Sequence, residues 1–105
     1  MENTIGKTTI APSVLITIAK LTTLAVQGVS RMAEGKVSPN DKEGVRVEVE
    51  DGLIHLDLYI IISSNQNARL IAEQIQQEVN RQITEIVGME VANINVHITD
   101  VDIEA

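Results

Sequence analysis

The chain has 105 residues and a formal net charge of −7, from 8 Lys or Arg against 15 Asp or Glu. This length favours one domain over residues 1–105, which can bury about two thirds of the surface that its unfolded chain exposes. The acidic charge argues against a nucleic-acid groove, which needs a basic stripe, and against direct adhesion to an anionic membrane.

Two features bear on the cellular compartment. Cysteine is absent, whereas small extracellular domains often need disulfides, and the polar start of the chain does not resemble a signal peptide. The stretch from Thr9 to Val29 is long enough to span a membrane, but Lys20 lies in its middle among scattered polar residues. The sequence therefore predicts a cytoplasmic protein without direct membrane insertion.

The first third of the chain predicts a helix between two irregular segments. Residues 1–6 read as a frayed start, and Lys7–Ile10 as a brief edge strand. A helix is expected from Pro12, which suits a first turn, to Gln27, with Gly28 closing it. Residues 30–43 are rich in turn formers and predict a flexible loop.

The faces of this first helix follow from helical spacing. Its apolar stripe is Val14, Ile18, Leu21 and Ala25, widened by Leu15, Ala19 and Val26, and its polar face is Lys20, Thr23 and Gln27. Ile16 falls on the polar side, so we expect the helix to be covered on more than one side.

The middle of the chain predicts a β-hairpin. Val45, Val47 and Val49 alternate with charged residues, Asp51-Gly52 suits a two-residue type I′ turn, and alternation resumes from Ile54 to Ile62. This turn fixes the register, which pairs Val49 with Ile54, Val47 with Leu56 and Val45 with Leu58 on one face, and Glu48 with His55 and Arg46 with Asp57 on the other.

The last third predicts a helix and a strand. Asn65–Val87 carries apolar residues at spacings of three and four, with Ser64 or Asn65 as the cap and Gly88 as the stop. A strand begins near Glu90, but its alternation changes phase near Thr99 and Asp100. Either a β-bulge lies there or the tail leaves the sheet. The fold expected is α+β, a small mixed β-sheet with two helices on one face, in the order short β-α-β-β-α-β.

These segments, taken together, resemble the alkaline shock protein (Gls-type cell-envelope stress response) family of bacteria. The matching pieces are Thr9 to Val14, Val26 to Val29 with Met32, Gly44 to Val49 with Asp51-Gly52, Asp57 to Ile60, and Gly88 to Val91 through Asn95 to Ile98. The chain departs from the family at Ser63-Ser64-Asn65, where an acidic-aromatic-glycine stretch is common.

The resemblance implies a non-enzymatic structural or adaptor protein of cell-envelope stress, a homo-oligomer that is held near the membrane by a small membrane-anchored family relative. An alternative within the family is a regulatory adaptor of fatty-acid biosynthesis enzymes. A small nucleic-acid-binding module is the third interpretation, which the charge and the single aromatic residue, Tyr59, oppose.

No catalytic, cofactor or metal site is expected from the residues. His55 and His97 share one predicted sheet face with Asp57 and Glu48, a set that can bind a transition metal, but solvated polar side chains explain it more simply. The expectation is instead an interaction surface for self-association, because some apolar residues fall on faces that the pattern assigns to solvent. These residues are Ile16, Leu53, Tyr59, Ile61, Val101 and Ile103.

Overall fold

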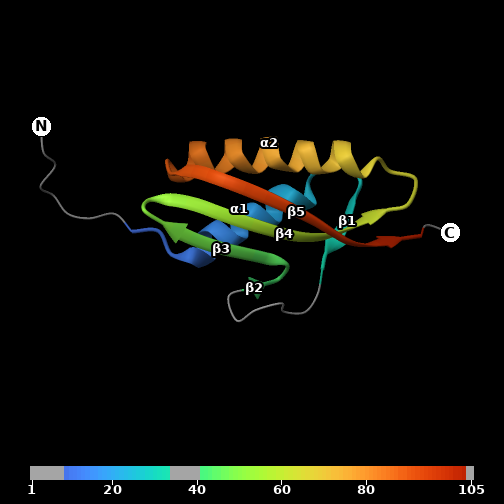
Figure 1. Cartoon of the computed structure of the whole chain (residues 1–105), viewed down its shortest axis with the longest axis horizontal. Coiled ribbons are helices and arrows are strands. Elements are labelled where there is room, and N and C mark those ends of the chain that lie inside the picture. The colour runs from blue at the N-terminus through green and yellow to red at the C-terminus, as the bar shows by residue number, and fades with distance from the viewer. Residues whose placement is uncertain (1–8, 34–40, 104–105) are drawn as a thin grey trace, which may run out of the picture.

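A computed structural model describes residues 9–33 and 41–103 of the chain. The elements are α1 (Pro12–Leu24), β1 (Val29–Met32), β2 (Asp41–Lys42), β3 (Val45–Glu50), β4 (Leu53–Ser63), α2 (Ala68–Val87) and β5 (Glu90–Asp102). Figure 1 shows the strands running side by side, with α2 along one side of the sheet and α1 behind it.

The strands form one mixed sheet around the long central strand β4. On one edge of β4, β3 pairs antiparallel with its first half and β1 antiparallel with its second half, while β2 extends the sheet beyond β3. On the other edge, β5 runs parallel to β4 along its full length. The α+β class and the mixed sheet are as predicted, since the connection from β4 through α2 to β5 is a parallel crossover.

The predicted hairpin is confirmed in every pairing. Val49 lies opposite Ile54, Val47 opposite Leu56 and Val45 opposite Leu58. Asp51 and Gly52 both have positive φ, 53° and 79°, as a type I′ turn requires. The turn and the alternation act together here, so local sequence is sufficient to set the register.

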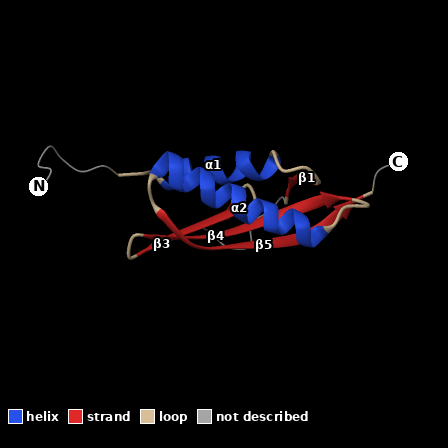
Figure 2. Cartoon of the chain, turned by 90° about the horizontal axis from the view of Figure 1, so that it is seen from above, coloured by secondary structure: helices blue, strands red, loops and turns tan. Residues whose placement is uncertain are grey.

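Both helices cover the same face of the sheet, as Figure 2 shows, and the core lies between the two layers. The central strand contributes Ile54, Leu56, Leu58 and Ile60, all fully buried, and α2 contributes Ile71, Ile75, Val79 and Ile83. The predicted amphipathic face of α2 is thus confirmed over its middle, whereas Ile86 at its end is exposed. We refer to the helix-covered side of the sheet as the inner face and to the opposite side as the outer face.

The predicted buried side of α1 is correct for Leu15, Ala19 and Val26, which widen the apolar stripe, and wrong for the stripe itself. The buried side is Leu15, Ala19, Thr23 and Val26, whereas the predicted stripe of Val14, Ile18, Leu21 and Ala25 faces outward. Thr23, which the pattern places on the polar face, is fully buried. The physical reason is the size of the buried residues, since Ala19 and Thr23 allow the helix to approach the sheet and α2 closely.

The ends of the helices also differ in part from the prediction. Helix α1 ends at Leu24 and not at Gln27, and Gly28 takes its positive φ of 101° in the following turn. Helix α2 is capped by Asn67, whose Oδ1 accepts a hydrogen bond from the backbone N–H of Leu70 at 3.1 Å, and not by Ser64 or Asn65. Gly88 ends α2 in the left-handed conformation, as predicted.

The predicted loop over residues 30–43 contains structure at both ends. β1 occupies its start and β2 its end, whereas residues 34–40 lie outside the described part. The short strand predicted at Lys7–Ile10 lies partly outside that part as well, and its two described residues, Thr9 and Ile10, are not in a strand. The short strand of the fold therefore follows α1 in the chain, because β1 completes the edge of β4 that β3 leaves unpaired.

The phase change in the last strand is a β-bulge. Ile98 lies opposite Ile60 and Asp100 opposite Ile61, so Thr99 is the extra residue. A second shift, between Val91 and Asn93, makes Ala92 an extra residue as well. The alternative in which the tail leaves the sheet is wrong, since pairing continues to Asp102.

Candidate functional site

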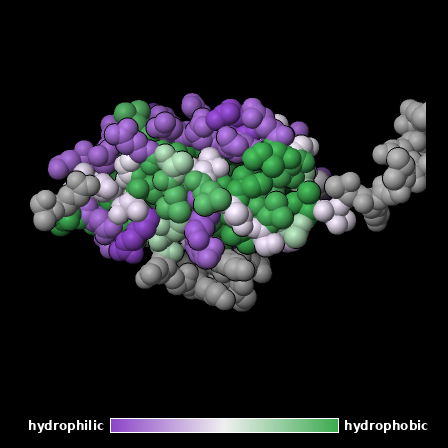
Figure 3. All heavy atoms as spheres, turned by 180° about the vertical axis from the view of Figure 1, so that it is seen from behind, coloured by the Kyte–Doolittle hydropathy of each residue, from purple (hydrophilic) through white to green (hydrophobic). Residues whose placement is uncertain are grey.

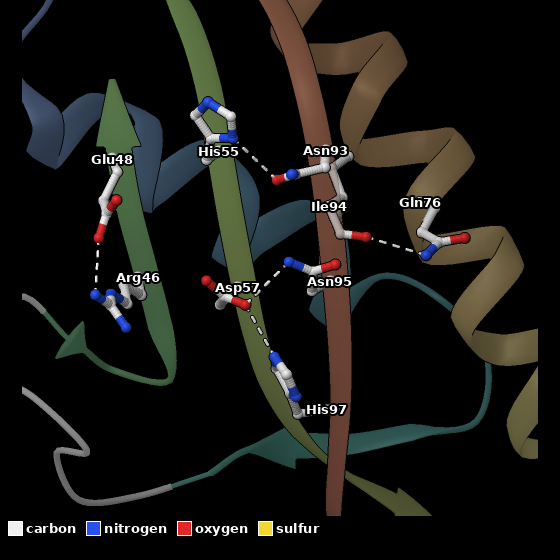
Figure 4. Close-up of polar contacts among 9 residues, drawn as sticks. All are labelled: Arg46, Glu48, His55, Asp57, Gln76, Asn93, Ile94, Asn95 and His97. Atoms are coloured by element: carbon white, nitrogen blue, oxygen red, sulfur yellow. Dashed lines mark hydrogen bonds and ion pairs between the residues drawn. The ribbon is translucent and has the colours of Figure 1, made fainter. Parts of the chain in front are cut away.

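Polar side chains from β4 and β5 form a connected cluster on the outer face. The parallel register places Asp57 opposite Asn95 and Tyr59 opposite His97. Asp57 Oδ1 lies 2.9 Å from His97 Nε2 and accepts a hydrogen bond from Asn95 Nδ2 at 3.2 Å, as Figure 4 shows. The His97 ring stacks on Tyr59, with ring centroids 4.6 Å apart and planes 13° from parallel. These four residues are called the outer-face cluster below.

The other polar residues of this face are engaged in separate pairs. His55 Nδ1 lies 3.3 Å from Asn93 Oδ1, and Arg46 Nη2 donates to Glu48 Oε1 at 2.7 Å (Figure 4). Of the four residues considered as metal ligands, His97 and Asp57 contact each other, whereas His55 and Glu48 have other partners. Among residues 9–33 and 41–103, no group of three or more His, Cys, Asp or Glu side chains could hold a metal ion.

The chemistry of the outer-face cluster is limited by what surrounds His97. A His bonded to a carboxylate can serve as a general base when a nucleophile lies within hydrogen-bond reach. His97 Nε2 contacts Asp57, and the face of the His97 ring stacks on Tyr59. These contacts fix the orientation of the ring and do not assemble a nucleophile, a base and an orienting acid.

A second polar contact joins the two edges of the sheet. Asp102 on β5 accepts hydrogen bonds from the Ser30 hydroxyl at 2.5 Å and from Arg31 Nε at 3.2 Å, both from β1. The Ser30 hydrogen bond, and then Arg31, hold the pKa of Asp102 below its ordinary value. The contact crosses β4 at the place where β1 begins and β5 ends.

The six residues expected to form an interaction surface are dispersed over the molecule. Ile16 packs partly against the core on the helix side, whereas Leu53 and Tyr59 lie half-buried on the outer face. Ile61 is only 6% exposed, contrary to the expectation, because β1 and β5 flank it and Arg31 and Asp102 join across its strand. Val101 and Ile103 are exposed near the end of β5, at 44% and 87%.

The outward side of α1 is an apolar surface that the sequence patterns assigned to the core. Val14 is 43% exposed, Leu21 61% and Leu24 37%, and the half-buried Ile18 lies among them. Figure 3 shows the side of the molecule on which α1 lies, where apolar side chains gather beside the hydrophilic surface of α2. The charge of α1 is a single Lys20, which pairs with Glu43 at 3.2 Å. We call Val14, Ile18, Leu21 and Leu24 the α1 surface.

The hydropathy of the sequence does not show which side of α1 is exposed. Helix α1 is apolar around nearly its whole circumference, so spacing identifies two possible buried sides. No helix in the described part of the chain combines the length and the hydropathy that a membrane span requires.

Three comparisons place the chain among known proteins. The model of the alkaline shock protein 23 family, described as having a cell envelope-related function, matches residues 1–103. The chain is 27% identical over 108 residues to YqhY of Bacillus subtilis (strain 168), covering 95% of this chain and 80% of that protein. It is 31% identical over 62 residues to YloU of the same organism, covering 59% of this chain and 52% of that protein.

Solved structures share the fold. A variant of MamM CTD superposes with a TM-score of 0.57 at 12% identity, over 87% of this chain and 96% of that chain. Another MamM CTD structure gives a TM-score of 0.56 at 12% identity, over 90% of this chain and 100% of that chain. At this identity the likeness shows the fold alone. The match to the family model covers almost the whole chain, and the chain therefore belongs to that family, the alkaline shock protein family with its cell envelope-related function.

Proposed function

We propose that this protein is a non-catalytic adaptor that self-associates and binds a protein partner in its cell envelope-related role. The observation that carries this proposal is the α1 surface. A monomeric protein rarely exposes a large contiguous apolar patch, and such a patch typically contacts another protein. Leu21 and Val14 lie on the same side of one helix, so a partner can cover both at once.

Charge favours a second copy of the chain as the occupant of the α1 surface. With a net charge of −7, two copies repel each other through most of their surfaces. Helix α2, for example, exposes Glu73 and Glu85. The α1 surface itself carries no acidic residue. Glu43 and Glu78 lie beside it, but they are paired with Lys20 and Arg81, so two α1 helices can pack together without bringing unpaired carboxylates into contact. Association through α1 also leaves the outer face and the β5 edge accessible.

In this proposal, the partner holds the protein near the membrane. The acidic charge opposes binding to anionic lipid, and the helices of the described part do not meet the requirements for a span. A partner that is itself attached to the membrane would hold an adaptor of this kind there. The protein would then be cytoplasmic and peripheral.

Sedimentation equilibrium at several protein concentrations tests the self-association. We expect the wild type to exceed the 11.4 kDa mass of one chain, and Leu21→Glu to sediment as one chain, because it places a carboxylate in the middle of the contact. Leu70→Glu is the matched control, since Leu70 is 60% exposed on the other helix and should leave the mass unchanged. A wild type that stays at 11.4 kDa at the highest concentration would contradict the proposal.

A further inference from the structure

The edge of β5 that faces away from β4 has no strand beside it in the described part of the chain, and α2 reaches this edge through Gln76, which an added strand would replace at the Ile94 carbonyl. β5 has 13 residues and pairs with β4 alone, so no strand of the described part of the chain covers its other edge. A long edge strand offers a row of backbone donors and acceptors to any extended chain. Many proteins protect such edges with Lys, Pro or β-bulges. The segment from Glu90 to Asp102 contains no Lys, Pro or Arg, and its two bulges, at Ala92 and Thr99, leave the stretch from Asn93 to Ile98 regular.

The hydrogen bonds identify which backbone groups face this open edge. The carbonyl of Ile94 accepts a hydrogen bond from Gln76 Nε2 at 3.0 Å, so it points away from β4. Because the N–H and C=O of alternate residues point to the same edge of a strand, those of Val96 and Ile98 also face outward. The groups of Asn95 and His97 then face β4.

The side chains of β5 on the inner face are incompletely covered. Val91, Ile94, Val96 and Ile98 pack against the core but remain half-buried. Their partners on β4 are Ile54, Leu56, Leu58 and Ile60, each 0% exposed. The difference arises because β4 has strands on both sides and β5 on one. An additional strand beside β5 would complete the burial of this row.

We propose that the open edge of β5 binds an extended, basic segment of a protein partner as an added strand. This inference rests on the proposed adaptor role and specifies how the partner is bound. Apolar side chains of the segment would extend the inner-face row, and Lys or Arg side chains between them would lie beside the acidic ends of β5, Glu90 and Asp100.

The same charges disfavour a second copy at this edge. Two β5 strands pairing antiparallel would bring Glu90 of one copy toward Asp100 and Asp102 of the other. Asp102 is already paired with Arg31. At each end of such a dimer, however, Glu90 of one copy would face Asp100 of the other. Self-association through α1 and partner binding through β5 therefore use separate surfaces.

Amide hydrogen exchange with a peptide probe tests the proposal. The probe is an eight-residue peptide of alternating Val and Lys with blocked ends, and a peptide with Glu in place of Lys is its control. We expect the Val-Lys peptide to slow exchange at the amides of Ile94, Val96 and Ile98, while those of Asn95 and His97 are slow already in the free protein. The Val-Glu peptide should protect none of the three amides at the same concentration.

Val96→Pro removes one outward N–H without removing a bond to β4, which an edge strand tolerates. We expect it to abolish binding of the Val-Lys peptide, whereas the matched Val96→Ala, which keeps the N–H, should retain binding. Binding of the peptide without protection of the three amides, or no binding at all, would overturn the proposal. Equal binding by Val96→Pro would overturn it as well.

Further outcomes separate this proposal from the self-association. Leu21→Glu should bind the Val-Lys peptide as the wild type does, so loss of self-association with intact peptide binding supports both surfaces as separate sites. A wild type that stays monomeric and still binds the peptide would support the β5 site alone. Protection of the Ile94, Val96 and Ile98 amides that rises with protein concentration in the absence of peptide would show a second copy at this edge. That result would overturn the choice of occupant.

Discussion

Asp102 and Arg31 are 71 residues apart in the chain and bond across the central strand, with Arg31 Nε 3.2 Å from Asp102 Oδ2. The pair joins β1 to β5 on either side of β4, and the Ser30 hydroxyl adds a hydrogen bond to the same carboxylate. It lies at the end of the sheet that the hairpin does not reach. The contact is therefore a polar link, in addition to those of the outer-face cluster, between the edge strand proposed to bind a partner and the rest of the sheet.

The first prediction concerns the pH dependence of stability. The Ser30 hydrogen bond and Arg31 lower the pKa of Asp102 from its ordinary value of 3.8, so its contribution is complete above that value and is lost as the pH falls through the folded-state pKa. We expect urea unfolding to show a smaller loss of stability between pH 7 and pH 3 for Asp102→Asn than for the wild type.

The control for this prediction is another carboxylate of the same strand. Asp100 accepts a hydrogen bond from the backbone N–H of Val101 and pairs with no Lys or Arg among the described residues. Asp100→Asn should therefore keep a pH dependence close to that of the wild type. If both variants change it equally, the contact between β1 and β5 does not contribute as argued.

The fold could be predicted from sequence wherever local signals agree. In the hairpin, alternation, the Asp51-Gly52 turn and cross-strand pairs all indicate one register, and that register is observed. The bulge at Thr99 is visible in the sequence as a change of phase. The short strand β1 is not visible there, because its four residues have no alternation and its pairing depends on β4, which lies far along the chain.

The candidate site was less predictable, since it depends on contacts between distant segments. The pairing of Asp57 with His97 requires the parallel crossover to place β5 in one register on β4, which hydropathy does not specify. The burial of Ile61 requires β1 beside it, and β1 lies in a segment whose composition predicts a loop. Exposure at Leu21 depends on which side of an almost uniformly apolar helix meets the sheet.

The second prediction compares two glycines with similar backbone angles. Gly44 has φ +80°, and a Cβ there would lie 2.9 Å from the backbone oxygen of Tyr59, which cannot move without disturbing β4. Gly52 has φ +79°, and a Cβ there would meet nothing within 4 Å. Gly52→Ala should cost about 1–2 kcal/mol for the left-handed conformation alone. Gly44→Ala should cost about 2 kcal/mol more than that, because the clash adds strain.

Chemical denaturation of both glycine variants measures the difference. Both variants lose stability because alanine must adopt a left-handed conformation. The additional loss of stability in Gly44→Ala therefore measures how closely the β2–β3 turn approaches β4. That approach includes the hydrogen bond from the Tyr59 N–H to the Gly44 carbonyl at 2.8 Å. Equal destabilisation would mean that the turn is not held against β4.

The last prediction tests which side of α1 is buried, on which the proposed self-association depends. Leu15 is 1% exposed and Leu21 is 61% exposed, so the same substitution should have different effects at the two positions. Leu15→Ala should destabilise the protein by about 2–5 kcal/mol, because it leaves a cavity beneath the helix. Leu21→Ala should change the free energy of unfolding by less than about 0.5 kcal/mol when measured at a concentration too low for association.

Under conditions of association, Leu21→Ala should instead weaken the contact between copies, since it removes apolar area from the α1 surface. The opposite ranking of the two variants would mean that the predicted stripe, and not the Leu15 side, meets the core, and the α1 surface would no longer be available to a second copy.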